Sequence, residues 1–136
     1  MENCQKPLHK LPKAERLHSH NAIQGLFTNG KSFYIYPFKV IVLERLPDSQ
    51  LPEVRILISV SKKKIKLAVA RNRIKRLIRE GWRKHKSPVI QQLNFYGTHL
   101  DIALIFTGHD IPDFLLIQKK INAVIKRLLQ EYEVAD

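Results

Sequence analysis

Hydrophobic positions in this chain recur with two periods, one typical of amphipathic helices and the other typical of strands. The helical period occurs at three places. It predicts a short helix over residues 21–28, a long helix from Leu67 to about His85, and a last helix whose apolar stripe runs from Phe114 to Tyr132.

Residues that commonly start or end helices lie at the borders of these segments. Gly30 follows the first segment, and we expect it to adopt the left-handed conformation that often ends a helix. Pro88 sets the latest end of the long helix, because proline inside a helix removes a backbone hydrogen bond. Asp110 or Asp113 is placed to cap the last helix.

Three other segments have the composition or the alternation of strands. They cover residues 32–46, with a defect expected at Pro37, residues 54–61 and residues 100–107. A turn at residues 47–52 separates the first two, and we expect these to run antiparallel. The order of elements predicts an α+β fold, a small two-layer sandwich in which helices pack on a mostly antiparallel sheet.

The length of 136 residues suits one domain. Residues 1–13 are polar and basic, which favours a flexible arm, so we place the single domain at residues 14–136. The arm has no apolar run typical of a signal peptide, and the longest apolar stretches elsewhere have the length of strands. The one cysteine, Cys4, has no second cysteine for a disulfide or a zinc site, which fits a reducing compartment. We therefore expect a cytoplasmic protein.

The charge of the chain adds information about its partner. Lys and Arg total 24 against 12 Asp and Glu, which gives a formal net charge of +12. Like charges repel one another in a compact fold, so an excess of this size indicates a polyanionic partner, most commonly nucleic acid. An anionic membrane surface is the alternative. The apolar face of the long helix is narrow and ends in Trp82, however, which favours burial in a core over contact with lipid.

Half of the cations gather in residues 61–86, which hold a single acid, Glu80. Helical spacing places a row of these cations opposite the apolar residues Ile74, Leu77 and Ile78. Guanidinium groups match phosphate oxygens in pairs, and an amide can contact a sugar hydroxyl or a base edge. A charged face is often simply solvated, but such faces mix both signs, whereas like charges repeat here. The candidate RNA-binding residues are Lys62, Lys63, Arg71, Asn72, Arg73, Lys75, Arg76, Arg79 and Arg83.

Aromatic residues earlier in the chain indicate a second surface. Ile23 and Phe27 lie one helical turn apart, and strand alternation puts Tyr34 and Tyr36 on one face. Aromatic side chains beside basic ones can stack unpaired bases. Core packing is the alternative. It stays open for Phe27, whereas the tyrosine hydroxyls favour a solvated edge.

The sequence carries no conventional catalytic or metal-binding motif. Its six histidines are scattered and lack the spacing of metal ligands. Asp101, Asp110 and Asp113 lie near one another, but caps and turns account for them better than a weak divalent-ion site does. We expect no catalytic residue and no metal ligand on the protein itself.

The segment Ala70–Glu80 (ARNRIKRLIRE) resembles the RNR signature of the bacterial ribonuclease P protein subunit. Residues 55–63 are similar to the strand and loop that lead into this signature, and residues 16–30 are similar to the family's N-terminal helix. The resemblance extends from about residue 14 to about residue 130. Two features depart from the common family form. The loop at residues 64–67 is one residue longer and lacks a glycine, and Ile23 stands where an aromatic residue is frequent.

This resemblance implies the ribosomal protein S5 domain 2-like fold with a left-handed βαβ crossover. It also implies a function: the family's protein binds a catalytic RNA, which carries the active site and uses Mg²⁺ to remove the 5′ leader of precursor tRNA. The protein screens repulsion between the two RNAs and contacts the leader, and no protein partner or membrane is implied. The matched RNA-facing residues are Arg71, Asn72, Arg73, Lys75, Arg76 and Arg79, and the matched leader cleft holds Phe27 with Ile23, Tyr34 or Tyr36.

Other functions remain open on the sequence alone. A ribosomal or ribosome-assembly RNA-binding protein would explain the charge, although it would not need the aromatic surface. A DNA-binding helix module is disfavoured because strands flank the long helix. A protein nuclease is disfavoured because the residues for such an active site are missing.

Overall fold

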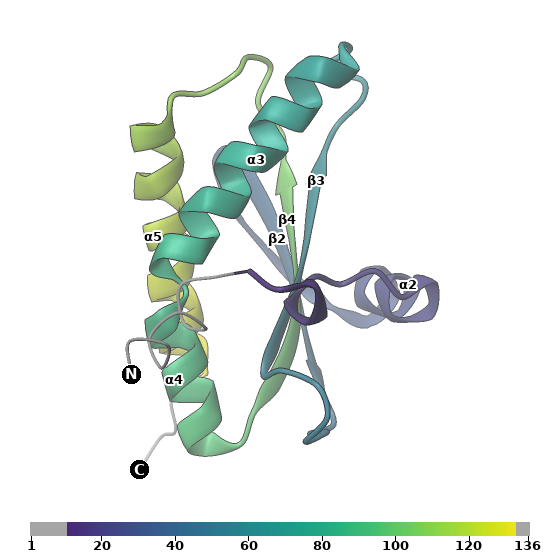
Figure 1. Cartoon of the computed structure of the whole chain (residues 1–136), viewed down its shortest axis with the longest axis vertical. Helices are drawn as coiled ribbons and strands as arrows, with labels where there is room; N and C mark the ends of the chain where they lie inside the picture. The colour runs from purple at the N-terminus through teal and green to yellow at the C-terminus, as the bar shows by residue number, and fades with distance from the viewer. Residues whose placement is uncertain (1–10, 133–136) are drawn as a thin grey trace.

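The computed structural model describes residues 11–132, which form a four-stranded sheet with helices on both faces (Figure 1). The α+β class is confirmed. Within residues 11–132, no helix combines the length and the apolar character that crossing a membrane requires. The elements are η2 (Lys13–Glu15), α2 (His20–Asn29), β1 (Lys31–Ile35), β2 (Phe38–Arg45), β3 (Val54–Val60), α3 (Ala68–His85), α4 (Ser87–Tyr96), β4 (His99–Phe106) and α5 (Phe114–Glu131).

The sheet is mixed, with strand order β1-β2-β4-β3. The β1–β2 and β2–β4 pairs are antiparallel, and the β3–β4 pair is parallel. Strand β3 therefore runs opposite to β2, as expected, but β4 lies between them. Neighbouring parallel strands need a crossover connection, and α3 and α4 provide it. The basic segment thus lies on the longest connection within the sheet.

The expected strand at residues 32–46 is a hairpin of two strands. Ile35 pairs with Phe38, so the turn consists of Tyr36 and Pro37, joined by a cis peptide bond. The Pro37 carbonyl accepts a hydrogen bond from the backbone N–H of Thr107 at 2.7 Å. The expected defect at Pro37 is in the right place, but the chain reverses direction there instead of continuing.

Strand alternation divides the hydrophobic side chains between the two faces of the sheet. Val40 and Val42 belong to the large core under α3, α4 and α5, whereas Ile41 between them faces α2. Leu26 of α2 is fully buried in this second, smaller core. Figure 1 shows the resulting layers, with α3, α4 and α5 on one face of the sheet and α2 on the other.

Helix α4 was not expected from the sequence. Pro88 lies in its first turn, where the missing N–H costs no hydrogen bond, so this proline begins a new helix as well as following the long one. Val89 and Leu93 bury the inner face of α4. Gly97 ends it in the left-handed conformation, with a φ of 69°.

The segment before α2 covers the outer edge of β3. Arg16 forms a parallel bridge with Ile56, and the N–H of Leu17 donates to the Ile56 carbonyl at 2.8 Å. This pairing leaves β3 with less open edge. A fully buried lysine, Lys86 at the α3–α4 junction, donates to the Glu15 carboxylate at 2.6 Å and ties the segment down. Residues 1–10 of the expected arm lie outside the described residues.

The caps of the helices are partly as expected. Asp113, not Asp110, caps α5 by accepting the N–H of Leu116 at 3.2 Å. Gly30 does end α2, but its φ is −74°, so the expected left-handed conformation is wrong. The reason for glycine is close approach. A Cβ at Gly30 would lie 2.5 Å from the Leu26 carbonyl oxygen and 2.6 Å from Cγ2 of Ile41.

We predict that Gly30→Ala lowers the free energy of unfolding by about 2 kcal/mol, because the backbone oxygen of Leu26 has no room to move aside. Gly25→Ala in the same helix is the matched control. Its Cβ would meet nothing within 4 Å, and alanine favours a helix over glycine, so stability stays the same or rises by up to about 1 kcal/mol. Urea denaturation followed by circular dichroism measures both. Equal stability of the two variants would contradict the steric explanation.

Candidate nucleic-acid interface

Helix α3 has one buried side and one cationic side. Ile74, Ile78 and Trp82 are at most 1% exposed and pack into the large core. The exposed side carries Asn72, Arg73, Arg76 and Arg79. The helical spacing in the sequence therefore predicts the orientation of α3 correctly. Burial of the apolar side leaves these polar side chains exposed to solvent.

Two of the expected RNA-binding cations have partners inside the protein. Arg71 donates through Nη1 to the carbonyls of Ile65 and Lys66, each at 2.9 Å. Arg83 pairs with Glu80, with 2.6 Å between Nη2 and Oε2. This hydrogen bond lowers the pKa of Glu80 and raises the pKa of Arg83, so both groups stay charged near neutral pH. The cationic face thus contains side chains that hold the fold as well as side chains directed outward.

The basic loop before α3 is fixed at both ends despite its lack of glycine. Ile65 is buried, and its N–H donates to the Ser61 carbonyl at 3.0 Å. Lys64 donates to the Thr107 carbonyl at 3.0 Å, which joins the loop to the end of β4. Lys62 and Lys63 are exposed beside it. The longer loop therefore leaves the expected cations at the surface.

The aromatic residues of the second surface differ in burial. Phe27 is 48% exposed and Tyr34 and Tyr36 are each 56% exposed, so none of the three is a core residue. The rings of Tyr34 and Tyr36 meet edge to face with centroids 6.3 Å apart. Ile23 is half-buried and packs against the smaller core instead.

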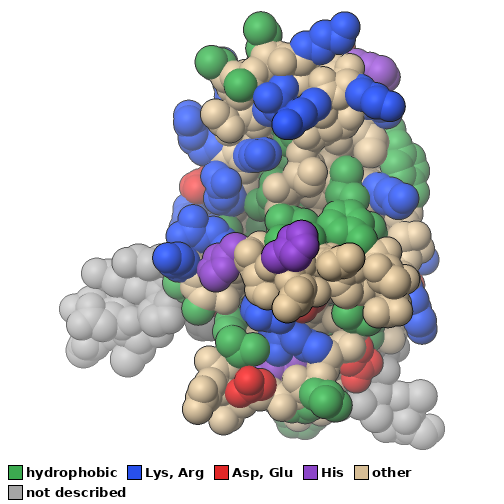
Figure 2. Space-filling view, turned by 90° about the vertical axis from the view of Figure 1, so that its right-hand side faces the viewer, with side chains coloured by type: hydrophobic (Ala, Val, Ile, Leu, Met, Phe, Trp, Pro, Cys, Tyr) green, Lys and Arg blue, Asp and Glu red, His purple; other side chains and the backbone are tan. Residues whose placement is uncertain are grey.

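Tyr34 connects this surface to the basic loop. Its hydroxyl lies 3.0 Å from the Thr107 hydroxyl, and Thr107 also accepts the bond from Lys64 through its carbonyl. Lys39 is paired with Tyr34 across the hairpin and is exposed on the same face. Figure 2 shows hydrophobic side chains gathered beside α2, with Lys and Arg side chains spread around them. The arrangement combines flat apolar rings with nearby cations, which suits unpaired nucleotides.

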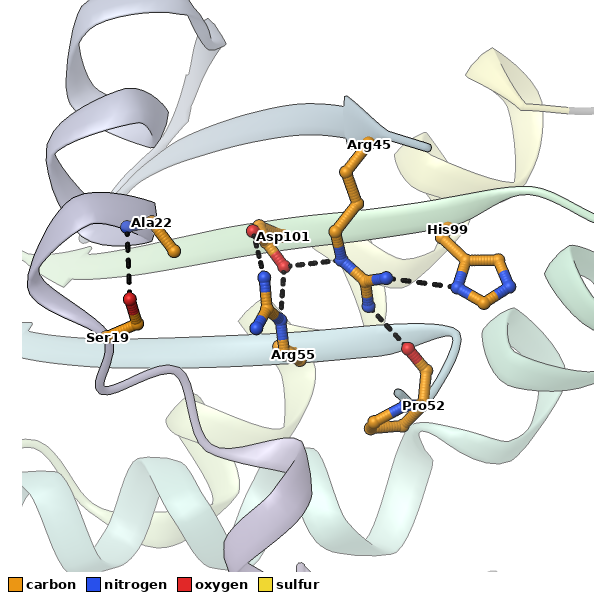
Figure 3. A network of polar contacts seen from close by, with 7 residues as sticks. All are labelled: Ser19, Ala22, Arg45, Pro52, Arg55, His99 and Asp101. Carbon is orange, nitrogen blue, oxygen red and sulfur yellow. Dashed lines mark hydrogen bonds and ion pairs between the residues drawn. The ribbon is translucent and has the colours of Figure 1, made fainter. Parts of the chain in front are cut away.

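A polar network not expected from the sequence ties β2, β3 and β4 together on the face that carries α2 (Figure 3). Asp101 is 3% exposed, and its Oδ1 accepts from the Nε atoms of Arg45 and Arg55 at 2.8 and 2.9 Å. Oδ2 accepts a second bond from Arg55 at 2.9 Å. Arg45 also contacts Nδ1 of His99 at 3.0 Å and the carbonyl of Pro52. One carboxylate therefore holds two guanidinium groups, and Asp101, for which the sequence favoured a cap or a turn, is an ion-pair centre.

The three aspartates considered as a weak divalent-ion site lie in three different environments. Asp101 belongs to the network, Asp113 caps α5, and Asp110 is exposed. Among residues 11–132, no three His, Cys, Asp or Glu side chains are grouped so that they could hold a metal ion.

Comparison with known proteins decides which family these surfaces belong to. A family model described as Ribonuclease P matches residues 11–129, which is most of the chain. The chain belongs to the ribonuclease P protein family. Because the match includes the helix, the loop and the strands described above, this family also settles the choice left open by the sequence between such a subunit and a ribosomal RNA-binding protein.

Relatives and solved structures agree with the family. The ribonuclease P protein component of Porphyromonas gingivalis (strain W83) is 34% identical over 126 residues, which cover 90% of this chain and 88% of the relative. That of Chlorobium phaeobacteroides is 32% identical over 130 residues, covering 89% of each. A structure of the Staphylococcus aureus RNase P protein matches with a TM-score of 0.64 at 31% identity and covers 85% of this chain and 95% of that one. The Thermotoga maritima RNase P protein matches with a TM-score of 0.63 at 25% identity, over 83% of this chain and 96% of that one.

The chain is thus a protein subunit of ribonuclease P, the endoribonuclease ribonucleoprotein that matures the 5′ ends of tRNA. Its fold is that of the ribonuclease P proteins, the ribosomal protein S5 domain 2-like fold. Membership in this family implies association with the ribonuclease P RNA.

We predict that Asp101→Asn in this ribonuclease P subunit lowers the free energy of unfolding by about 3 kcal/mol, because two neighbouring guanidinium groups lose their shared counter-charge. Asp110→Asn is the matched control: it removes the same charge at an exposed position, and we expect a change within about 0.5 kcal/mol. Urea denaturation measures both. A stability of Asp101→Asn equal to that of the control would mean that the network does not hold the strands together.

Proposed function

We propose that the exposed side of α3 binds phosphates of the catalytic RNA and that the aromatic surface beside α2 binds the 5′ leader of precursor tRNA. The one-sided charge of α3 is the observation that carries the first part. Arg73, Arg76 and Arg79 point away from the core and make no hydrogen bond or ion pair with the rest of residues 11–132. An anion is the partner that such a face lacks.

The energetics of this contact are electrostatic. Each phosphate that an arginine neutralises releases counterions from the RNA, so affinity falls steeply as salt concentration rises. The remaining expected RNA-binding residues, Lys62, Lys63, Asn72 and Lys75, extend the surface along the loop and the helix. Arg71 acts mainly by fixing the basic loop from inside, and Arg83 keeps its place beside Glu80.

The leader contact rests on stacking rather than on charge alone. An unpaired leader can lay its bases on Phe27, Tyr34 and Tyr36 while Lys39 and Lys64 lie near its backbone. Ile23 packs against the smaller core and offers no ring of its own. The surface therefore favours single-stranded RNA without requiring one sequence.

In this proposal the protein does not perform the chemistry. The catalytic RNA hydrolyses the phosphodiester bond and holds the Mg²⁺, while the cations of the protein reduce the repulsion between the RNA and its precursor substrate. Because precursor tRNA is made in the cytoplasm, we place the protein there.

The decisive test is cleavage of a leader-bearing precursor tRNA by the cognate catalytic RNA at low Mg²⁺, with and without the protein. We expect the protein to restore cleavage at the mature 5′ end. The double variant Arg73→Ala, Arg76→Ala should lose this effect. Cleavage that is equally fast with and without the wild-type protein would contradict the proposed role.

We predict that Arg73→Ala and Arg76→Ala each weaken binding to the catalytic RNA by about 1–3 kcal/mol. Each should also reduce the slope of log affinity against log salt by about 0.9, because one phosphate contact is lost. Lys126→Ala on α5 is the control, since it removes one exposed cation away from α3. Filter binding over a series of salt concentrations measures affinity and slope together. If binding depends on the total charge of the protein and not on the exposed face of α3, all three variants will show the same loss of affinity.

We predict that Phe27→Ala weakens binding of leader-bearing precursor tRNA to the assembled enzyme by about 1–2 kcal/mol and leaves binding of leaderless tRNA unchanged. Stability should fall little, because about half of Phe27 is already exposed. Phe95→Ala on α4, which is 81% exposed, is the control for loss of a surface ring. If Phe27→Ala lowers the melting temperature and affects both RNAs equally, Phe27 is a structural residue.

A further inference from the structure

A groove between α3 and α5 borders the cationic face proposed above and shares Arg73 and Arg76 with it, but its apolar residues have no role in phosphate binding. It has a volume of about 550 Å³, within the range of ligand-binding pockets of roughly 300–1,000 Å³. Phe114, the first residue of α5, forms one wall. The other wall belongs to α3 and consists of Arg73, Arg76, Leu77, Glu80 and Lys84.

The groove exists because the two helices touch closely at one point and diverge from there. At Gly81 an added Cβ would lie 2.8 Å from Cδ1 of Ile121 and 3.3 Å from Cγ2 of Ile117. Towards the N-terminus of both helices the ribbons separate (Figure 1). Leu77 and Phe114 are therefore only half-buried and leave an apolar floor open to solvent.

The rim of the groove is cationic. Lys84 lies over the face of Phe114, with Nζ 5.3 Å from the ring centroid. Arg76 and Arg73 lie on the same wall as Leu77, one residue and four residues before it in the helix. The one acid, Glu80, is hydrogen-bonded to Arg83, which lowers its pKa and offsets its charge. The site thus offers an aromatic face with positive charge around it.

We propose that this groove holds an unpaired nucleobase of the catalytic RNA, with the base on Phe114 and Leu77 and the adjoining phosphates on Arg73, Arg76 and Lys84. The charges identify the occupant: three cations around an aromatic floor match a nucleotide, which has a flat ring and an anionic backbone. A helical RNA backbone would use the cations alone and make no stacking contact with Phe114. The proposal rests on α3 being the RNA-binding helix and adds a base contact to its phosphate contacts.

The stacking part is tested by Phe114→Leu in the full-length protein, with binding to the cognate catalytic RNA as the readout. We expect affinity to fall about tenfold, while the salt slope stays unchanged because no phosphate contact is lost. Phe114→Tyr keeps the ring and should bind like the wild type. Phe95→Leu is the matched control, because it makes the same change at an exposed ring outside the groove. Lys84→Gln should instead reduce the salt slope by about 0.9.

A second readout does not depend on the stability of Phe114→Leu. Phe114 is replaced by a photoreactive phenylalanine analogue, and the crosslinked nucleotide is mapped on the RNA of the complex. We expect one unpaired nucleotide. The proposal is overturned if Phe114→Leu binds the RNA with wild-type affinity or loses no more affinity than Phe95→Leu. It is also overturned if the crosslink is absent or is confined to base-paired RNA.

Arg79→Ala separates this inference from the proposed function, because Arg79 lies on α3 outside the groove. If Arg79→Ala weakens binding and Phe114→Leu does not, α3 binds the RNA and the groove does not hold a base. If neither variant weakens binding, the proposed role of α3 fails and the groove proposal fails with it.

Discussion

The burial of one side of α3 is the constraint on which the rest of this structure depends. Like charges at neighbouring turns of the helix each cost a few tenths of a kcal/mol, so the isolated segment would be a poor helix. Ile74, Ile78 and Trp82 are almost completely buried, and each such side chain contributes about 1.5–3 kcal/mol. Tertiary packing therefore outweighs the repulsion, and the protein presents to solvent a row of cations that α3 could not maintain alone.

The sheet and the flanking segments serve this arrangement by fixing where α3 begins and ends. Arg71 holds the loop before the helix, and Lys86 after the helix is tied to Glu15 of the segment that covers β3. Lys64 joins the same loop to the end of β4, where Tyr34 is also anchored through Thr107. The basic surface and the aromatic surface are thus connected through protein hydrogen bonds, so their spacing is set before any RNA binds.

The sequence predicts the parts of this structure that depend on local periodicity. The orientation of α3 and the apolar stripe of α5 follow from the spacing of residues along one element. The exposure of Tyr34 and Tyr36 follows from their hydroxyl groups, which favour a solvated edge. The order of strands does not. Placing β4 between β2 and β3 depends on how α3 and α4 cross over the sheet, and no local pattern carries that information.

Several misjudged positions have one physical cause, which is a contact between distant segments. Gly30 looks like a left-handed cap, but it is required by the approach of Leu26 and Ile41. Pro88 looks like the end of a helix because its role in starting α4 depends on a buried face that packs against the core. Asp101 looks like a cap or turn residue in the sequence, but the register of the strands places Arg45 and Arg55 beside it. In each case the residue type indicates a special role, but the residues that it contacts are distant in the sequence.

The same reasoning explains why the cations could not be assigned individually. In the sequence, Arg71, Arg76 and Arg83 are all candidate RNA-binding residues of one basic segment. In the structure, Arg71 binds carbonyls of the loop, Arg83 binds Glu80, and Arg76 lines the groove beside Phe114. Only the last of these three is directed mainly at solvent.

The division between cations that hold the fold and cations that face solvent bears on how a small basic protein binds selectively. Phosphate contacts attract any RNA and weaken together as salt rises. Stacking on exposed rings does not depend on salt in this way, and it is available only to unpaired bases. The protein has rings next to cations on both faces of the sheet, at Tyr34 and Tyr36 on one and at Phe114 on the other. With cations beside each set of rings, the choice among RNA segments would then depend on the rings.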